Sequence, residues 1–182
     1  MLITEFCEKY GVASIDWGLS HVKAQYLNMD DFFYNSNRYN DILWAVTRKG
    51  VLTQKEYIQF NCWCVNQVKQ LLKDDRSKQA LIIAEKYLDD DATDQPTKAE
   101  LDAAMVKAQT VYQELREEDV TTYDEVAIID VAYAVYKIPY EYPEEVSKAV
   151  AHAADANAYM TYDAARALQV EYLRENFKPN WE

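Results

Sequence analysis

The sequence predicts an all-α protein, a multi-helix bundle of about six to eight helices that ends in a long alanine-rich helix. Apolar residues make up 49% of the 182 residues, which is enough for a substantial core. Only 3 glycines and 4 prolines are present, whereas a sheet protein of this size usually needs more turn residues. Apolar residues recur at helical spacing, and no alternating β-branched run lies between turn residues.

The N-terminal part of the chain predicts three short helices and one turn. Helices over 2–10 and 39–49 each end directly before a glycine, the residue that most easily takes the left-handed conformation of a helix end. Between them, Ser14 can cap a helix whose apolar positions are Ile15, Leu19 and Val22. Residues 28–37 are polar and are expected to form a turn, with Phe32 and Phe33 tucked inward.

Three further helices begin at a capping box, in which a threonine and a glutamate three residues later satisfy free N–H groups of the first turn. The boxes are Thr53 with Glu56, Thr97 with Glu100 and Thr122 with Glu125, and the helices are expected over 53–72, 97–115 and 122–138. Asp74 and Asp75 are candidate caps for another helix over 76–88. Pro139 disfavours helical geometry in the residue before it and so ends the third of these helices.

The spacing of apolar residues also predicts which side of each helix faces the core. In the helix over 53–72, the inward residues are Tyr57, Phe60, Cys64, Val68 and Leu71. In the helix over 97–115, they are Leu101, Ala104, Met105, Ala108, Val111, Tyr112 and Leu115. In the helix over 122–138, they are Val126, Ile129, Tyr133 and Tyr136.

The final helix is expected to begin at Pro143 and to run to about Phe177. Glu144 and Glu145 would lie beside the positive end of its dipole. Nine alanines between 149 and 167 suit close helix–helix approach, either within the chain or in a homodimer.

A single helical domain over 1–182 is expected, with the polar, acidic linker 86–96 as a possible division between halves 1–88 and 97–182. The first residues lack the basic lead of a signal peptide, and no apolar run approaches the roughly 20 residues of a membrane span. The 3 cysteines cannot all pair within the chain, so reduced thiols are expected. These features predict a cytoplasmic protein, either bacterial or in an infected host.

The net charge of −12 is confined to one part of the chain. Residues 85–145 hold 17 acidic and 5 basic side chains, whereas residues 1–84 hold 9 and 10, and residues 146–182 hold 5 and 4. A protein that binds nucleic acid or anionic membrane directly needs a basic face, so neither is expected as a partner.

The residues expected to contact a partner are acidic and tyrosine side chains of this segment. They are Asp89, Asp90, Asp91, Glu114, Glu117, Glu118, Asp119, Asp124, Tyr140, Glu141, Tyr142, Glu144 and Glu145. The expected partner is a basic protein surface, such as that of a nuclease or another nucleic-acid-binding protein, because a row of carboxylates can imitate DNA phosphates. The alternative is that the acidity keeps the protein soluble and the tyrosines pack between helices.

No metal or cofactor site is expected. The three aspartates 89–91 and Asp94 lack the spaced oxygens, the turn glycine and the final glutamate of a calcium loop, so a solvated linker is favoured. His152 and Asp155 stand three apart on one helix face and could hydrogen-bond, but no further residue at ligand spacing joins them.

No enzymatic activity is expected either. Glycines only at 11, 18 and 50 exclude a glycine-rich phosphate loop. Asp130 is surrounded by apolar residues; if buried it would have a raised pKa and become a candidate functional group. The favoured interpretation places Asp130 on a narrow solvent face, paired with Lys137, and an enzyme with a helical pocket near Asp130 or His152 remains the alternative.

One block of the sequence resembles a known family. The block comprises the apolar stretch 42–46, Cys62, Cys64, the run Asp74-Asp75-Arg76, Ala80-Leu81, Ala84-Glu85, Thr97, Glu100-Leu101 and Ala103-Ala104. It resembles the small all-helical phage and bacterial proteins labelled as immunity proteins, over roughly residues 40–108. Members usually carry proline after the arginine, where this chain has Ser77. The resemblance implies an all-helical fold, a phage or mobile-element origin and binding rather than catalysis, and it carries no site residues across.

Two functions through protein–protein binding follow from the charge and this resemblance. The first is an acidic inhibitor, a phage counter-defence factor of the anti-CRISPR or anti-restriction type, acting as a DNA mimic on a nucleic-acid-handling host protein. The second is a toxin-immunity protein that neutralises a basic toxin. A structural assembly component is a further possibility, which a large oligomer in solution would reveal.

Overall fold

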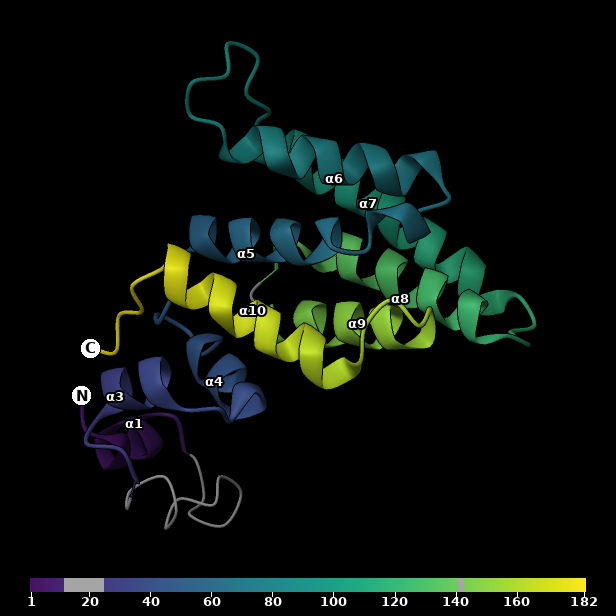
Figure 1. Cartoon of the computed structure of the whole chain (residues 1–182). Helices are drawn as coiled ribbons and strands as arrows, with labels where there is room; N and C mark the ends of the chain where they lie inside the picture. The colour runs from purple at the N-terminus through teal and green to yellow at the C-terminus, as the bar shows by residue number, and fades with distance from the viewer. Residues whose placement is uncertain (12–24, 141–142) are drawn as a thin grey trace. The chain divides into compact units, whose positions relative to one another are not determined.

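A computed structural model describes residues 1–11, 25–140 and 143–182 of the chain (Figure 1). The prediction of an all-α multi-helix bundle is confirmed: these residues form nine α-helices and one 3₁₀ helix, and their only β feature is an isolated bridge between Lys49 and Leu52. The elements are α1 (Ile3–Lys9), α3 (Met29–Asn35), α4 (Tyr39–Val46), α5 (Gln54–Asn66), the 3₁₀ helix η1 (Lys69–Leu71), α6 (Asp75–Leu88), α7 (Lys98–Glu117), α8 (Tyr123–Lys137), α9 (Pro143–Ala156) and α10 (Tyr162–Asn176). No helix in the described ranges combines the length and hydrophobicity needed to cross a membrane.

The chain forms two compact units, a smaller one from Met1–Thr53 with Val170–Glu182 and a larger one from Gln54–Gln169. The acidic linker 86–96 lies inside the larger unit, where α6 and α7 on its two sides pack against each other. The boundary between the two compact units in the sequence therefore does not fall at this linker.

The C-terminal residues hold the N-terminal helices together in the smaller unit. Trp181 packs edge-on against the rings of Phe6 and Phe33, at centroid distances of 5.6 and 6.0 Å. The side chain of Arg174 donates hydrogen bonds to the carbonyl oxygens of Phe33 (2.7 Å) and Ser36 (2.6 Å), which lie at the end of α3. The carbonyl groups left free at that helix end thus receive donors from the other end of the chain.

The turn predicted over 28–37 is wrong, because Met29–Asn35 is the helix α3. The Asn28 side chain caps this helix by accepting a hydrogen bond from the Asp31 N–H at 2.9 Å. Its polar residues lie on the outer side, while Phe32 and Phe33 are fully buried. The helix predicted after Ser14 lies outside the described residues.

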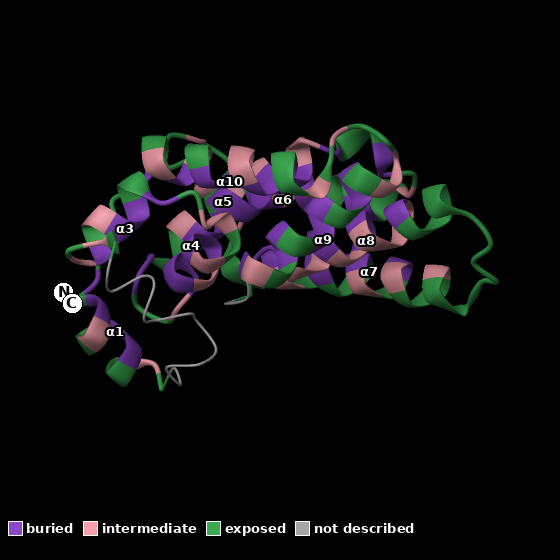
Figure 2. Cartoon of the chain, turned by 60° about the horizontal axis from the view of Figure 1, so that its bottom comes forward, coloured by how far each residue is buried: buried purple, intermediate pink, exposed green. Residues whose placement is uncertain are grey.

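The larger unit is built around α8, which packs against α7 and α9 and also contacts α5 and α6 (Figures 1 and 2). The inward face predicted for this helix is wrong. Ala127, Val131 and Ala134 are fully buried, whereas Val126 is 40% exposed. With neighbours on several sides, the face that carries Ala127, Val131 and Ala134 lies against the other helices, and Val126 lies toward the surface.

The helix predicted over 53–72 is shorter than expected, although its predicted core face is confirmed. The α-helix ends at Asn66, and the Val68 N–H then donates to the Val65 carbonyl oxygen (3.1 Å), which tightens the backbone toward η1. The five residues predicted to face inward, Tyr57, Phe60, Cys64, Val68 and Leu71, are all buried.

The long helix predicted from 143 to 177 is wrong, because a turn separates α9 from α10. Ala158 has φ of 53°, and the Tyr159 N–H donates to the Ala154 carbonyl oxygen at 2.9 Å. The Ala158 N–H donates to the Asp155 carbonyl oxygen at 3.0 Å, which completes a Schellman motif. Glycine normally takes the left-handed position of this motif, so the sequence lacks the usual signal that a helix ends here.

Candidate partner-binding site

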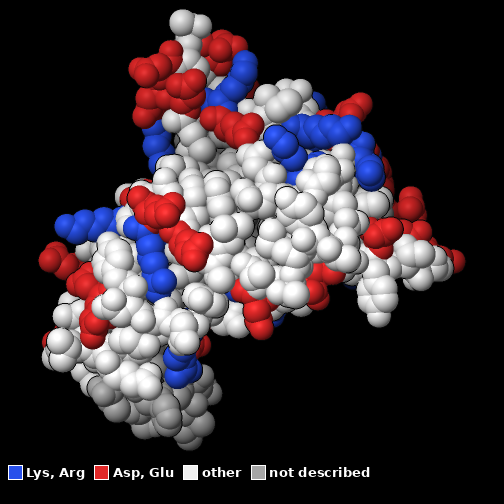
Figure 3. Space-filling model, viewed as in Figure 1, with Lys and Arg blue, Asp and Glu red and all other residues white. Residues whose placement is uncertain are grey.

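The structure distributes the predicted partner-binding residues over several places in the larger unit. The loop between α6 and α7 carries Asp89, Asp90 and Asp91. The end of α7 and the residues after it carry Glu114, Glu117, Glu118 and Asp119. The first turn of α8 contains Asp124, the residue Tyr140 lies just after α8, and the first turn of α9 contains Glu144 and Glu145. Glu141 and Tyr142 lie outside the described residues. Acidic side chains gather over the α6–α7 loop and over the α7–α8 turn (Figure 3).

The carboxylates of the α6–α7 loop are largely engaged within the chain. Asp90 forms an ion pair with Lys55, and Asp94 accepts a hydrogen bond from the Lys86 amine at 2.9 Å. Hydrogen bonding to these lysines, with their positive charge, lowers the pKa of both aspartates. Asp89 accepts a hydrogen bond from the Asp91 N–H at 3.1 Å. Across the described ranges, no three His, Cys, Asp or Glu side chains are placed to hold a metal ion.

Residues 117–126, which we call the acidic tip, present a different surface. Glu117, Glu118 and Asp119 are exposed and make no ion pair with any described residue. Beside them the tip exposes three apolar side chains, Val120 (42%), Tyr123 (80%) and Val126 (40%). An exposed apolar group ringed by charge is the pattern of a binding surface.

Local hydrogen bonds fix the shape of the acidic tip. The Glu125 carboxylate accepts hydrogen bonds from the N–H groups of Thr121 (2.8 Å) and Thr122 (2.9 Å), and the Thr122 hydroxyl accepts from the Glu125 N–H (3.3 Å). This is the predicted capping box, and its N–H donors lower the pKa of Glu125. Asp124 accepts a hydrogen bond from the Asn157 amide at 3.1 Å. The exposed groups of the tip therefore stand on an ordered turn.

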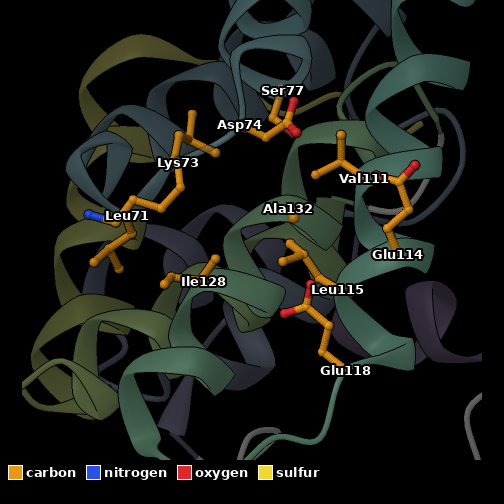
Figure 4. A pocket seen from close by; sticks show the side chains of 11 residues that line it. Leu71, Lys73, Asp74, Ser77, Val111, Glu114, Leu115, Glu118, Ile128 and Ala132 are labelled. Carbon is orange, nitrogen blue, oxygen red and sulfur yellow. The ribbon is translucent and has the colours of Figure 1, made fainter.

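A cleft of about 340 Å³ opens between η1, α6, α7 and α8 (Figure 4). Its walls include the apolar side chains of Leu72, Val111, Leu115, Ile128 and Ala132. A smaller hollow of about 150 Å³ shares Leu115, Glu118 and Ile128 with it and extends to Val120 and Glu125. The cleft thus continues into the acidic tip.

The polar groups of the cleft are partly paired. Arg76, at its edge, donates hydrogen bonds to Asp74 (2.8 Å) and Glu114 (3.1 Å), and these bonds lower the pKa of both carboxyls. Ser77 lines the cleft and is 1% exposed, yet its hydroxyl has no hydrogen-bond partner among the described residues. Glu118 also lines the cleft and has no ion pair there.

Three of the tyrosines in the acidic segment form a cluster rather than an exposed row. The rings of Tyr112, Tyr133 and Tyr136 lie 5.2 to 5.3 Å apart, and the Lys137 amine lies 5.4 and 5.3 Å from the last two. The Glu145 carboxylate accepts a hydrogen bond from the Tyr133 hydroxyl and lies 3.4 Å from the Lys137 amine. Burial is the main reason that the pKa of Tyr133 and of Tyr136 is raised. Glu145 is therefore already engaged within the chain.

Asp130 is partly buried on α8, and this burial raises its pKa while the nearby charge of His152 on α9 opposes the rise. The predicted pair of Asp130 with Lys137 is wrong: Asp130 makes no ion pair with any described residue, and Lys137 pairs with Glu145. The His152 ring packs against the Tyr162 ring at 4.9 Å, and the Asp155 carboxylate accepts a hydrogen bond from the Tyr162 N–H at 3.3 Å.

No protein-family model matches this sequence, and no similar chain was found among curated proteins or solved structures. The resemblance to immunity proteins therefore stays a prediction. The acidic residues of the tip could be predicted from the sequence, whereas the exposed apolar residues among them and the cleft beside them could not. The signal for the cleft that the sequence offers is Ser77, a polar residue within a predicted helix.

Proposed function

We propose that this protein is an acidic inhibitor that binds a basic surface of another protein through its acidic tip. The observation that carries the proposal is the set of exposed apolar residues Val120, Tyr123 and Val126, next in sequence to the exposed carboxylates of Glu117, Glu118 and Asp119, which make no ion pair with any described residue. Apolar side chains supply contact area, and the carboxylates attract and orient a positively charged partner.

The partner class follows from this chemistry. Proteins that handle nucleic acids carry basic grooves for phosphates, and carboxylates at the mouth of such a groove compete with them. We infer a phage counter-defence factor, of the anti-CRISPR or anti-restriction type, that acts on a nuclease or another nucleic-acid-binding protein. Neutralisation of a basic toxin nuclease as an immunity protein would use the same surface.

Charge reversal in the two acidic loops tests this function. One variant carries Glu117→Lys, Glu118→Lys and Asp119→Lys in the tip, and the matched control carries Asp89→Lys, Asp90→Lys and Asp91→Lys in the α6–α7 loop. Proteins retained from a bacterial lysate at low salt and released at high salt are identified by mass spectrometry, and the affinity of the purified partner is then measured by calorimetry.

The tip variant is expected to lose at least about 100-fold in affinity, in line with the loss of several interfacial charge pairs, while the control stays within about threefold. The partner should also lose its nucleic acid when this protein binds, as followed by fluorescence polarisation. Equal losses for the two variants, or an unchanged affinity of the tip variant, would contradict the proposal.

A further inference from the structure

The cleft beside the acidic tip has the chemistry of a pocket for one cationic side chain. We propose that it receives an arginine side chain of the basic partner, an inference that rests on the proposed function and names the group that is recognised. Three features carry it: an unpaired buried hydroxyl, a set of carboxylates that already holds one guanidinium group, and apolar walls of matching size.

The hydroxyl of Ser77 is the first feature. A hydroxyl withdrawn from water without a hydrogen bond raises the free energy of the folded protein, so such groups are rare unless a ligand or water satisfies them. Ser77 is 1% exposed, lines the cleft and has no partner among the described residues. The cleft therefore borders a polar group that has no hydrogen-bond partner among the described residues.

The carboxylates are the second feature. Asp74 and Glu114 hold the guanidinium of Arg76 between them, so their spacing already suits this planar group. Glu118 stands one helical turn beyond Glu114, lines the same cleft and has no ion pair with described residues. It is the carboxylate left for a second guanidinium.

The charge balance of the cleft also favours a cation. Asp74, Glu114 and Glu118 line it, and the cations close to them are Lys73, in the lining, and Arg76, which is hydrogen-bonded to Asp74 and Glu114. Figure 4 shows the Lys73 amine on the side of Leu71, away from the carboxylates of Glu114 and Glu118. Glu118 is therefore the carboxylate of the cleft that has no cationic partner among the described residues.

The third feature is the size and lining of the cleft. Its volume of about 340 Å³ lies near the lower end of the range of small-molecule sites, which suits one long side chain better than a folded element. Leu115 and Ile128 line both this cleft and the hollow that leads to the tip. They can cover the methylene stem of an arginine whose charged end reaches the carboxylates.

Nuclear magnetic resonance titration of the full chain tests the pocket directly. The probe is N-acetyl-arginine amide, and the matched control is N-acetyl-citrulline amide, which has the same shape without the charge. We expect saturable shifts at Ser77, Leu115 and Ile128 with the arginine probe. Binding of the citrulline probe should be about tenfold weaker, as expected when a charge-assisted hydrogen bond becomes a neutral one.

Two single substitutions in the lining of the cleft and one control outside it accompany the titration. Glu118→Gln should weaken the arginine probe about fivefold to tenfold, and Ser77→Ala should weaken it about threefold, in line with the loss of one hydrogen bond each. Glu175→Gln, which changes an exposed carboxylate on α10 that does not line the cleft, should leave the probe affinity unchanged. Equal binding of the two probes, or shifts confined to the α6–α7 loop, would overturn the pocket.

The outcome separates this inference from the proposed function. A chain that binds its partner through the acidic tip but shows no shifts with the arginine probe overturns the pocket alone. If charge reversal in the tip leaves partner affinity unchanged, the proposed function fails, whatever the probe does.

Discussion

In the α6–α7 loop, Asp90 and Asp94 lie against lysines of the same chain, whereas in the acidic tip Glu117 and Glu118 face solvent without an ion pair among the described residues. Both loops join helices of one compact unit, and both are rich in acid. The lysines near the α6–α7 loop cancel part of the negative electrostatic field of its aspartates. The field of Glu117 and Glu118 in the tip is not cancelled by an ion pair with a described residue. A segment's formal charge therefore says less about binding than the pairing of each carboxylate.

The largest expected effect sharpens this comparison at the exposed ring of the tip. Tyr123→Ala should weaken partner binding about 10- to 100-fold, because an exposed tyrosine at the centre of an interface is a typical hot spot. Tyr140, which is 40% exposed beyond the other end of α8, is the matched control, and Tyr140→Ala should stay within about threefold. Calorimetry with the purified partner measures both, and a larger loss for Tyr140→Ala would move the site away from the tip.

A second expected effect concerns the order of the tip. Thr122→Ala removes the cap of α8 and should lower the free energy of unfolding by about 1 kcal/mol, measured by urea denaturation. Thr97→Ala removes the equivalent box after the α6–α7 loop and should cost a similar amount. Only the first variant should also weaken partner binding. If both variants weakened partner binding equally, or if neither did, the ordered backbone of the tip would not contribute specifically to binding.

The turn between α9 and α10 provides a third prediction, because Asn157 of this turn holds Asp124 of the tip. Ala158→Gly should raise the free energy of unfolding by up to about 1 kcal/mol, since glycine takes the left-handed conformation without a steric penalty, although it loses more backbone entropy on folding. Thermal and urea unfolding measure the change. Ala156→Gly, inside α9, is the control and should be destabilising.

The smallest expected effect tests the pairing in the α6–α7 loop. Lys55→Gln frees Asp90, and because the pair is exposed it should change the free energy of unfolding by no more than about 0.5 kcal/mol. Partner affinity should stay within about twofold, since this loop is not the proposed site. A clear gain in affinity would show that an unpaired carboxylate in either loop can bind the partner.

Acid titration compares the two loops in one experiment. The pKa values of Glu125 and Asp90 are lowered in the folded chain, by N–H donors and by Lys55 respectively. Because the folded pKa lies below the unfolded one, the stabilisation is present above the unfolded pKa and is lost as the pH falls through the folded pKa. Carboxyl resonances should therefore titrate below the usual acidic range at both residues, and Lys55→Gln should restore the usual value at Asp90 alone.

Local rules predicted much of the fold. The boxes at Thr97 and Thr122 and the cap at Asp74 depend on residues within one turn, and the structure has them where the sequence places them. The helix α3 was missed because its polar residues are more typical of a turn. The turn at Ala158 was missed because an alanine takes the left-handed conformation that glycine usually takes. The inward face of α8 depends on its neighbours, which no single-helix pattern contains.

The candidate site also has features that local sequence predicts and features that depend on tertiary packing. Its acidic residues can be read from composition, but Ser77, Leu115 and Ile128 come from three different helices, and only tertiary packing brings them to one cleft. Which carboxylates remain unpaired is also a tertiary property. Lys55 stands 35 residues from Asp90 in sequence, and Arg76 stands 38 from Glu114.

The two ends of the chain lie side by side in the smaller unit (Figures 1 and 2), and the side-chain amine of Lys9 donates a hydrogen bond to the Glu182 carbonyl oxygen at 2.6 Å. A short peptide joining residue 182 to residue 1 would therefore add little strain, and new ends could be opened in the exposed loop between α6 and α7. Such a circular permutant would keep the order of every helix around the ring. It would also allow a label or surface anchor to be attached at the α6–α7 loop, whose charge is partly neutralised by lysines, and the acidic tip would stay unmodified.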